Sequence, residues 1–327
     1  MRTLFAASGL LLSAIVAISV PFTESFVVGG RLATSKPQTS SLSATPADAI
    51  ATLAASQSAS VDRIAAAMPG LTPNTELSWS AMDGVTVGGA PASLDGRECP
   101  GADGNVAWLS NLCVQGRLSG LTIFNGPLTN VPHLLSTCVI FGTDQIGFIL
   151  DFRPRAYGAY EKRDEQGNYP GPDELGREAF TFSGNRKEYD TKFGTPEVQQ
   201  FLQSTMASFE GASEVSYPLK DLEKLTRGPL YMDVVMPLTD GNVATIAAAR
   251  DQAVSYWLQW ATVEKDQHAH RPGAPINSQY VYDTKYRQNA FGALLPLYNS
   301  LFGRDDGAKL AAADSGPLDE AYVGGGS

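Results

Sequence analysis

The histidines are the side chains of this sequence best suited to proton chemistry near neutral pH, and the 327 residues contain three of them. His133 directly precedes the apolar run 134–141, where it can serve as a proton donor or can simply end a strand, which is the commoner role. His268 and His270 could supply half of a metal site, but the loop 268–278 contains no cysteine and no carboxylate to complete it. We therefore expect no bound metal.

Several enzyme classes carry short motifs that this sequence lacks. It contains no G-x-S-x-G, no P-loop, no H-E-x-x-H and no G-x-G-x-x-G, so the hydrolase, NTPase, zinc-peptidase and dinucleotide-binding classes have no support. Trp257 and Trp260 share one face of an expected helix and are more commonly core residues than part of a cofactor site. The three cysteines are too few and too scattered for a disulfide framework, and their odd number fits a reducing compartment.

The composition is that of an acidic, folded protein. Hydrophobic residues make up 43% of the chain, which is enough for a core, and the length allows one large domain or two small ones. The net charge of −10 argues against nucleic acid as a partner, because phosphate binding requires a basic surface.

The first sixty residues are typical of a targeting sequence. Arg2 and the apolar run 4–20 indicate a secretory signal peptide, placed at residues 1–25, with a membrane anchor as the alternative. Residues 26–60 are rich in Ser and Thr and contain one acid, Asp48, which is the composition of a transit peptide. Together the two parts resemble the bipartite address of algae with secondary plastids. We expect a plastid protein with no membrane span after processing.

The elements that must position any site are strands in the first half and helices in the second. A helix is expected at 46–68, followed by short strands near 85–87, 107–118 and 121–124. The clearest strands are 134–141 and 146–152. Because only the turn residues 142–145 join them, these two strands must be antiparallel neighbours.

After the hairpin, residues 153–192 read as a long surface excursion. The later pattern predicts helices near 196–209, 240–265 and 290–302, a strand at 229–238, and a flexible tail over 306–327. A central antiparallel sheet flanked by helices is an α+β fold.

Four short motifs resemble the red chlorophyll catabolite reductase family, within the ferredoxin-dependent bilin reductase superfamily. An apolar hairpin ends in Leu-Asp-x-x-Pro-Arg at residues 150–155. Pro-Leu-Tyr follows at 229–231, Asp283 precedes Lys285, and Leu-Phe-Gly stands at 301–303. The motifs keep the family's order over residues 75–305, which places the reductase-like domain at 61–305.

This resemblance implies an α/β/α sandwich that binds an open-chain tetrapyrrole between the sheet and the C-terminal helices. In the family no flavin, nicotinamide or metal is bound. Reduced ferredoxin supplies electrons one at a time, and carboxyl groups supply protons to the bilin. The family reaction reduces a double bond of red chlorophyll catabolite during chlorophyll breakdown.

The resemblance also assigns candidate site residues. Asp283 corresponds by position to a proton-donating acid of the family. The family's second acid is a Glu on the first hairpin strand, where this chain has Thr137, which can hold a substrate carbonyl or a water but cannot deliver a proton at neutral pH. Substrate-binding candidates are His133 and, as partners for propionate groups, Arg155, Lys285 and Arg287.

Three functions remain open on these grounds. The first is a plastid ferredoxin-dependent reductase of an open-chain tetrapyrrole, which Asp283 favours. The second is a non-catalytic carrier or photosynthetic-complex assembly factor that binds a bilin or chlorophyll derivative, which Thr137 favours. The third is a scaffold without a ligand. Expected partners are the tetrapyrrole, ferredoxin and possible second copies of the chain in a homodimer. Ferredoxin would dock on basic groups at 153–155, 186–187 and 285–287.

Overall fold

The computed structural model describes residues 44–100, 105–155, 189, 191–215, 226–269 and 276–317, without the side chains of Ala81 and residues 276–282. Its helices are α1 (Pro46–Ala67), α3 (Pro196–Ser208), α5 (Asp240–Leu258), α6 (Ile276–Phe302) and α7 (Arg304–Ser315), with a 3₁₀ turn η1 (Ala81–Asp83) and a π-helical turn η4 (Gln259–Val263). Its strands are β1 (Thr72–Pro73), β2 (Thr86–Val87), β3 (Ala90–Glu98), β4 (Val106–Val114), β5 (Leu118–Asn125), β6 (His133–Phe141), β7 (Gln145–Arg153), β8 (Ser213–Glu214) and β9 (Leu230–Pro237).

The strands form one antiparallel sheet in the order β1-β3-β4-β5-β6-β7-β9-β8, with β2 paired to β3. The hairpin expected from the sequence is its centre: β6 and β7 pair from His133 opposite Arg153 to Phe141 opposite Gln145. Gly142 has a φ of +64°, a left-handed conformation that glycine adopts without strain. β5 and β9 flank the hairpin, so residues on β6 and β7 are covered on both sides by strands.

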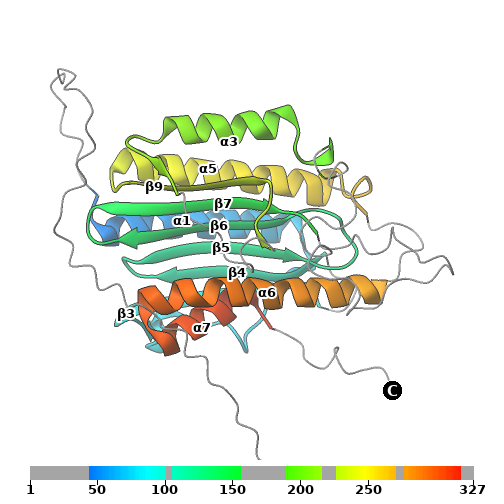
Figure 1. Cartoon of the computed structure of the whole chain (residues 1–327). Helices are drawn as coiled ribbons and strands as arrows, with labels where there is room; N and C mark the ends of the chain where they lie inside the picture. Colours follow the sequence, from blue (N-terminus) through cyan, green and yellow to red (C-terminus); the bar gives the residue numbers. More distant parts are fainter. Residues whose placement is uncertain are drawn as a thin grey trace, which may run out of the picture. The chain divides into compact units, whose positions relative to one another are not determined.

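Helices cover both faces of the sheet (Figure 1), which confirms the α+β prediction and its α/β/α layering. α1 and α5 pack on each other and on β4, β5 and β6, and α3 lies against β9 and α5. α7 packs on β4 and β5 from the other face and contacts α6. Each face has its own apolar core, and Trp257 and Trp260 are buried in the one under α5, as predicted.

The folded domain begins earlier than the expected boundary at residue 61. The Thr45 side chain accepts a hydrogen bond from the backbone N–H of Asp48 at 3.2 Å and so caps α1, and Pro46 occupies the first turn. Ile50 and Leu53 are buried in the core against the sheet. Residues 46–60, which we assigned to the transit segment, are therefore part of the fold.

The C-terminal third is more helical than the sequence predicted. α6 begins at Ile276 instead of residue 290, so Asp283 lies on a helix. Residues 304–315 form α7, in which Leu310 and Asp314 are buried, although the tail was expected to be flexible from residue 306. The polar sequences of these segments do not show the apolar periodicity by which a helix is predicted. The helices are stabilised by packing on the sheet and on each other.

Trp108 of β4 joins the sheet to the end of α7. Its indole Nε1 donates to the carbonyl of Ala313 at 2.9 Å, and the side chain is fully buried. Gly96 of β3 and Gly316 lie against the ring so closely that a Cβ at either position would overlap it. The two glycines thus make room for the largest side chain of this core.

Most of the predicted excursion 153–192, the residues 1–43 of the expected targeting sequence, and residues 318–327 of the tail lie outside the described residues. Among the helices that are described, none combines the length and the apolar character needed to cross a bilayer.

Candidate functional site

Alternate residues of β6 face α6 and form the floor of the candidate site. Cys138 belongs to the core under α1 and α5, whereas its neighbour Val139 belongs to the core on the α6 side. Because side chains alternate along a strand, His133 and Thr137 lie on the α6 side with Val139. Both β6 residues predicted from the sequence therefore face the C-terminal helices.

His133 is buried, and its tautomer is set by the backbone. The N–H of Asn125 donates to Nδ1 of His133 at 3.0 Å, so the neutral ring carries its proton on Nε2. Nε2 is buried and has no hydrogen-bond partner among the described residues. The ring lies against Phe124 and Tyr286, with centroids 5.3 and 4.9 Å away. The site thus contains a buried N–H donor with no protein acceptor in the described structure.

The surroundings keep this ring neutral. Burial lowers the pKa of His133 well below 6.5, and the positive charges of Arg155, Arg153 and Arg287 lower the pKa further. A protonated imidazole is therefore disfavoured, and His133 is suited to donate a hydrogen bond and not to deliver a proton. The lowered pKa speaks against the proton-donor alternative, and the role of His133 in substrate binding stays a prediction.

Arg155 and Asp283 form a buried ion pair, which joins two residues that the sequence places 128 positions apart. One terminal nitrogen of Arg155 donates to Oδ2 of Asp283 at 2.5 Å and to the carbonyl of Gly126 at 2.8 Å. The other two nitrogens of Arg155 have no partner among the described residues. The opposite charges of the two side chains stabilise each other in this buried contact.

Thr137 lies between Gly120 of β5 and Ile149 of β7 at the middle of the sheet. Its side chain is buried, and Oγ1 has no hydrogen-bond partner within the described structure. A buried hydroxyl without a partner costs about 1–3 kcal/mol. Such a group is expected where a ligand completes the bonding.

α6 presents some of the predicted residues to this site and not others. Asp283, Tyr286 and Arg287 are three or four positions apart, share one helix face and are buried. The hydroxyl of Tyr286 donates to the carbonyl of Thr226 at 2.6 Å, which holds the helix to the segment before β9. Lys285 is two positions from Asp283, about 200° around the helix, and is only half-buried. Its role in substrate binding stays a prediction.

A second charged group, which the sequence analysis missed, lies beside the first on β7 and β9. The carboxylate of Asp151 accepts from Nε of Arg153 at 2.9 Å and from the backbone N–H of Gly228 at 3.1 Å. Arg227 donates to Asp233 at 3.1 Å, and its guanidinium lies 4.6 Å from the ring centroid of Tyr231. Burial raises the pKa of Asp151, while these positive and N–H groups counteract the rise. The alternation of polar residues along 149–153 and 231–233 was the available signal.

A third missed group lies where α7 meets the sheet. Asp314 accepts from the hydroxyls of Ser110 and Thr122 at 3.1 Å each and from Tyr298 at 2.5 Å. Asp314 is fully buried, and burial raises its pKa. Because three hydroxyl groups donate to this one carboxylate, its hydrogen bonds are formed within the protein, and they hold α7 against β4 and β5.

Three arginines of the basic groups expected to dock ferredoxin are largely buried. Arg155 and Arg287 are 2% and 5% exposed, and the side chain of Arg153 is 12% exposed. Lys285 is half-buried, and residues 186–187 lie outside the described residues. Docking of ferredoxin on these groups stays a prediction.

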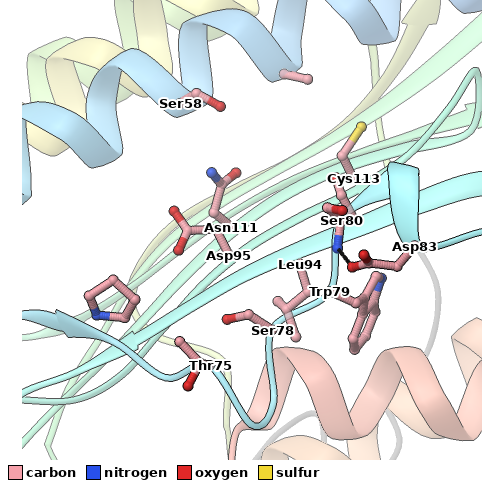
Figure 2. A pocket seen from close by; sticks show the side chains of 13 residues that line it. Ser58, Thr75, Ser78, Trp79, Ser80, Asp83, Leu94, Asp95, Asn111 and Cys113 are labelled. Carbon is pink, nitrogen blue, oxygen red and sulfur yellow. Dashed lines mark hydrogen bonds between the residues drawn. The ribbon is translucent and has the colours of Figure 1, made fainter. Parts of the chain in front are cut away.

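The smaller of two pockets lies next to the candidate site. A cavity of about 80 Å³ lies between β6, β7 and β9 and α6, beside the Asp151 group. A wider pocket of about 520 Å³ lies between α1 and the β3–β4 edge (Figure 2), where Ser58, Asp95, Asn111 and Cys113 line it. None of the predicted site residues lines this wider pocket.

Comparison with known proteins finds similarity among solved structures alone. No family model matches the chain, and no curated protein matches it. The fold is similar to the crystal structure of phytochromobilin synthase from tomato in complex with biliverdin, at 12% sequence identity and a TM-score of 0.49, over 80% of this chain and 82% of that one. At this level the similarity carries no argument about function, which is argued below from the residues of the chain.

Proposed function

We propose that this chain is a ferredoxin-dependent reductase of an open-chain tetrapyrrole of the red chlorophyll catabolite type. It would act in the plastid of an alga with a secondary plastid and carry no bound cofactor. The proposal combines the family resemblance of the motifs with the chemistry of the site between the sheet and α6.

The observation that carries the proposal is a set of buried polar groups left without partners on the α6 face. These are Nε2 of His133, Oγ1 of Thr137 and two nitrogens of Arg155, each without a partner among the described residues. Native proteins satisfy nearly all buried polar groups, so such a cluster favours a ligand with several acceptors. The lactam carbonyls and propionates of a bilin are acceptors of this kind.

The proposed reaction needs two electrons and two protons for each C=C bond that becomes CH–CH. Two encounters with reduced ferredoxin supply the electrons. Asp283 is the proposed donor of one proton, and Arg155 stabilises the carboxylate that remains, because the two are in direct contact. Thr137 would hold the water that supplies the second proton, and the Nε2–H of His133 would bind a carbonyl oxygen of the substrate.

A non-catalytic tetrapyrrole-binding protein is the second candidate, and two observations favour it. Thr137 cannot deliver a proton at neutral pH, and the low pKa of His133 removes it as an acid. Asp283 is then the single acid among the predicted site residues. A carrier would need the same hydrogen-bonding groups but no second proton.

An anaerobic assay of the full-length chain with reduced ferredoxin separates the two candidates. Red chlorophyll catabolite and a panel of bilins are followed by absorbance and fluorescence. A reductase yields a blue-shifted or blue-fluorescent product. Truncation at residue 61 is to be avoided in this assay, because it removes most of α1.

Asp283→Asn is the decisive variant, with Asp251→Asn as its control on the exposed side of α5. We expect Asp283→Asn to lose turnover at least a hundredfold and to keep the pigment-induced absorbance change. The control should behave as the parent protein. Pigment binding without product at saturating reductant would exclude the reductase and leave the carrier.

A further inference from the structure

The cavity under α6 has the volume and the lining to bind one side chain of a larger ligand. Its walls from Leu135, Ile149 and Leu294 are apolar, and Arg153 and Arg227 also line it. An engineered apolar cavity of about 150 Å³ holds a benzene molecule, so about 80 Å³ suits a group of a few heavy atoms. The cavity is therefore too small for a tetrapyrrole but large enough for one of its side chains.

The charges of the lining favour an anion. Two guanidinium groups line the cavity against one carboxylate, Asp151. That carboxylate is already bonded to Arg153 and to the N–H of Gly228. Asp233 bonds Arg227 without lining the cavity. The two aspartates thus hold the guanidinium groups in place, and of the two carboxylates only that of Asp151 lines the cavity.

Arg153 can bond a further anion without losing its present partner. The contact with Asp151 uses only its Nε, and the side chain of Arg153 also interacts with the hydroxyl of Tyr286. A guanidinium has five N–H donors in a fixed plane, and its two terminal nitrogens match a carboxylate in a bidentate manner. Apolar walls beside the donors favour a carboxylate on an aliphatic chain over a fully hydrated ion such as inorganic phosphate.

Residues that line the cavity are direct cross-strand neighbours of residues on β6, among them His133, which was assigned to substrate binding. Arg153 is the direct cross-strand partner of His133, and Asp151 is the partner of Leu135. Directly opposed residues in an antiparallel pair have Cα atoms about 4.5–5.5 Å apart. A ligand above His133 is therefore within reach of the cavity with a short side chain.

We propose that this cavity binds the carboxylate of an aliphatic arm, the propionate of the tetrapyrrole, with Arg153 and Arg227 as its partners. This inference rests on the proposed function, which supplies the tetrapyrrole. It replaces Lys285 by residues to which the sequence analysis gave no binding role. The arm fixes which end of the pigment lies over His133.

Absorbance titration of the full-length chain tests the inference with two probes at one salt concentration. Biliverdin carries two free propionates, and biliverdin dimethyl ester carries none. We expect biliverdin to bind at least tenfold more tightly than the ester. Arg153→Met should reduce this preference below threefold by weakening only the binding of the acid, and Arg227→Met should act in the same direction.

The control is Arg63→Met, which removes an exposed arginine of α1 and should change neither affinity. Arg153→Met leaves Asp151 buried without its guanidinium, so the double variant Asp151→Asn/Arg153→Met replaces it where the single variant does not fold. Equal affinity for acid and ester, or equal weakening of both by Arg153→Met, would overturn the carboxylate site while leaving the proposed function intact. No absorbance change with either pigment would contradict the proposed function, and the inference with it.

Discussion

Two buried polar groups, one on each face of the sheet, differ in how many of their hydrogen bonds are formed within the protein. On the α1–α5 face, Arg250 is completely buried, and its nitrogens donate to Ser136, Ser119, Cys138 and the carbonyl of Leu53 at 2.9–3.2 Å. Every nitrogen of that guanidinium has an acceptor. On the α6 face, His133, Thr137 and Arg155 each keep a buried polar atom without a partner in the described structure.

The difference separates a structural polar cluster from a binding one. Both faces remove polar groups from water, which is costly unless hydrogen bonds replace the lost hydration. The Arg250 cluster regains those bonds within the protein and can only stabilise the packing of α5 on the sheet. His133, Thr137 and Arg155 on the α6 face regain those bonds only in part, so their unbonded polar atoms are available to a ligand.

The largest expected effect is on the buried ion pair of the α6 face. Arg155→Met leaves Asp283 buried without its partner, and we expect a loss of about 4 kcal/mol in the free energy of unfolding. The double variant Arg155→Met/Asp283→Asn should lose clearly less than the sum of the two single variants, because neither charge then remains alone. Urea unfolding of all four proteins measures this. Additive losses would mean that the two groups are not coupled.

Arg250→Met should come next and should affect stability alone. It removes the five buried hydrogen bonds that the guanidinium donates, at a cost of about 3 kcal/mol. The pigment affinity of the folded protein should stay unchanged, which titration below the unfolding midpoint would measure. Arg63→Met, which breaks an exposed ion pair with Asp251, should cost under about 1 kcal/mol. A selective loss of pigment binding in Arg250→Met would break the distinction between the faces.

Burial of His133 makes the free energy of unfolding depend on pH. Its pKa is well below 6.5 in the folded protein, so the unfolded chain takes up a proton first as the pH falls. The stability contributed by the neutral ring is therefore present above pH 6.5 and is lost below it, by up to about 1.4 kcal/mol per pH unit. The carboxylates with raised pKa, Asp151 and Asp314, act in the opposite direction but are common to parent and variant.

The measurement is the difference in unfolding free energy between the parent and His133→Asn from pH 7.5 to 5. We expect this difference to shift in favour of the variant as the pH falls. His268→Asn is the control, because Glu264 partly offsets the effect of burial on the pKa of His268. A pH-independent difference for His133→Asn would show that the ring titrates alike in the folded and the unfolded chain, which would contradict its burial.

The smallest expected change in stability is that of Thr137→Val, which is compared with Thr122→Val on the same face of the sheet. Thr137→Val removes a hydroxyl without a partner, so stability should be unchanged or rise by about 0.5–1 kcal/mol, while pigment binding or turnover should weaken. Thr122→Val removes a hydroxyl bonded to Asp314 and should cost about 1–2 kcal/mol. Thermal unfolding of both variants, with pigment titration, checks this. Equal destabilisation would mean that Oγ1 of Thr137 is satisfied in the native protein.

The sequence was most informative where the chain has short-range order. The hairpin of β6 and β7, the capped starts of α1 and α3 and the buried tryptophans of α5 all follow from alternation, turn residues or caps. β3 was missed because its residues 90–98 include Pro, Gly and three charged side chains, and its pairing with β4 is what makes it a strand.

The candidate site was only partly predictable for the same reason. Asp283, His133 and Thr137 were named from a motif resemblance, and the structure gathers them on the face between the sheet and α6. The contact of Arg155 with Asp283 joins residues 128 apart, and no local pattern reports it. Arg153 and Arg227 were overlooked as ligand groups because charged residues in a strand and before it usually face water.

Trp108 determines when the molecule can finish folding. Its indole is covered by residues 313–316, which the ribosome adds about two hundred positions later. A nascent chain that ends before α7 has the strands of the sheet but exposes the ring, together with Ser110 and Thr122, whose acceptor Asp314 is also missing. A premature stop codon before residue 313 would therefore leave the ring of Trp108, and with it an apolar surface on the central sheet, uncovered.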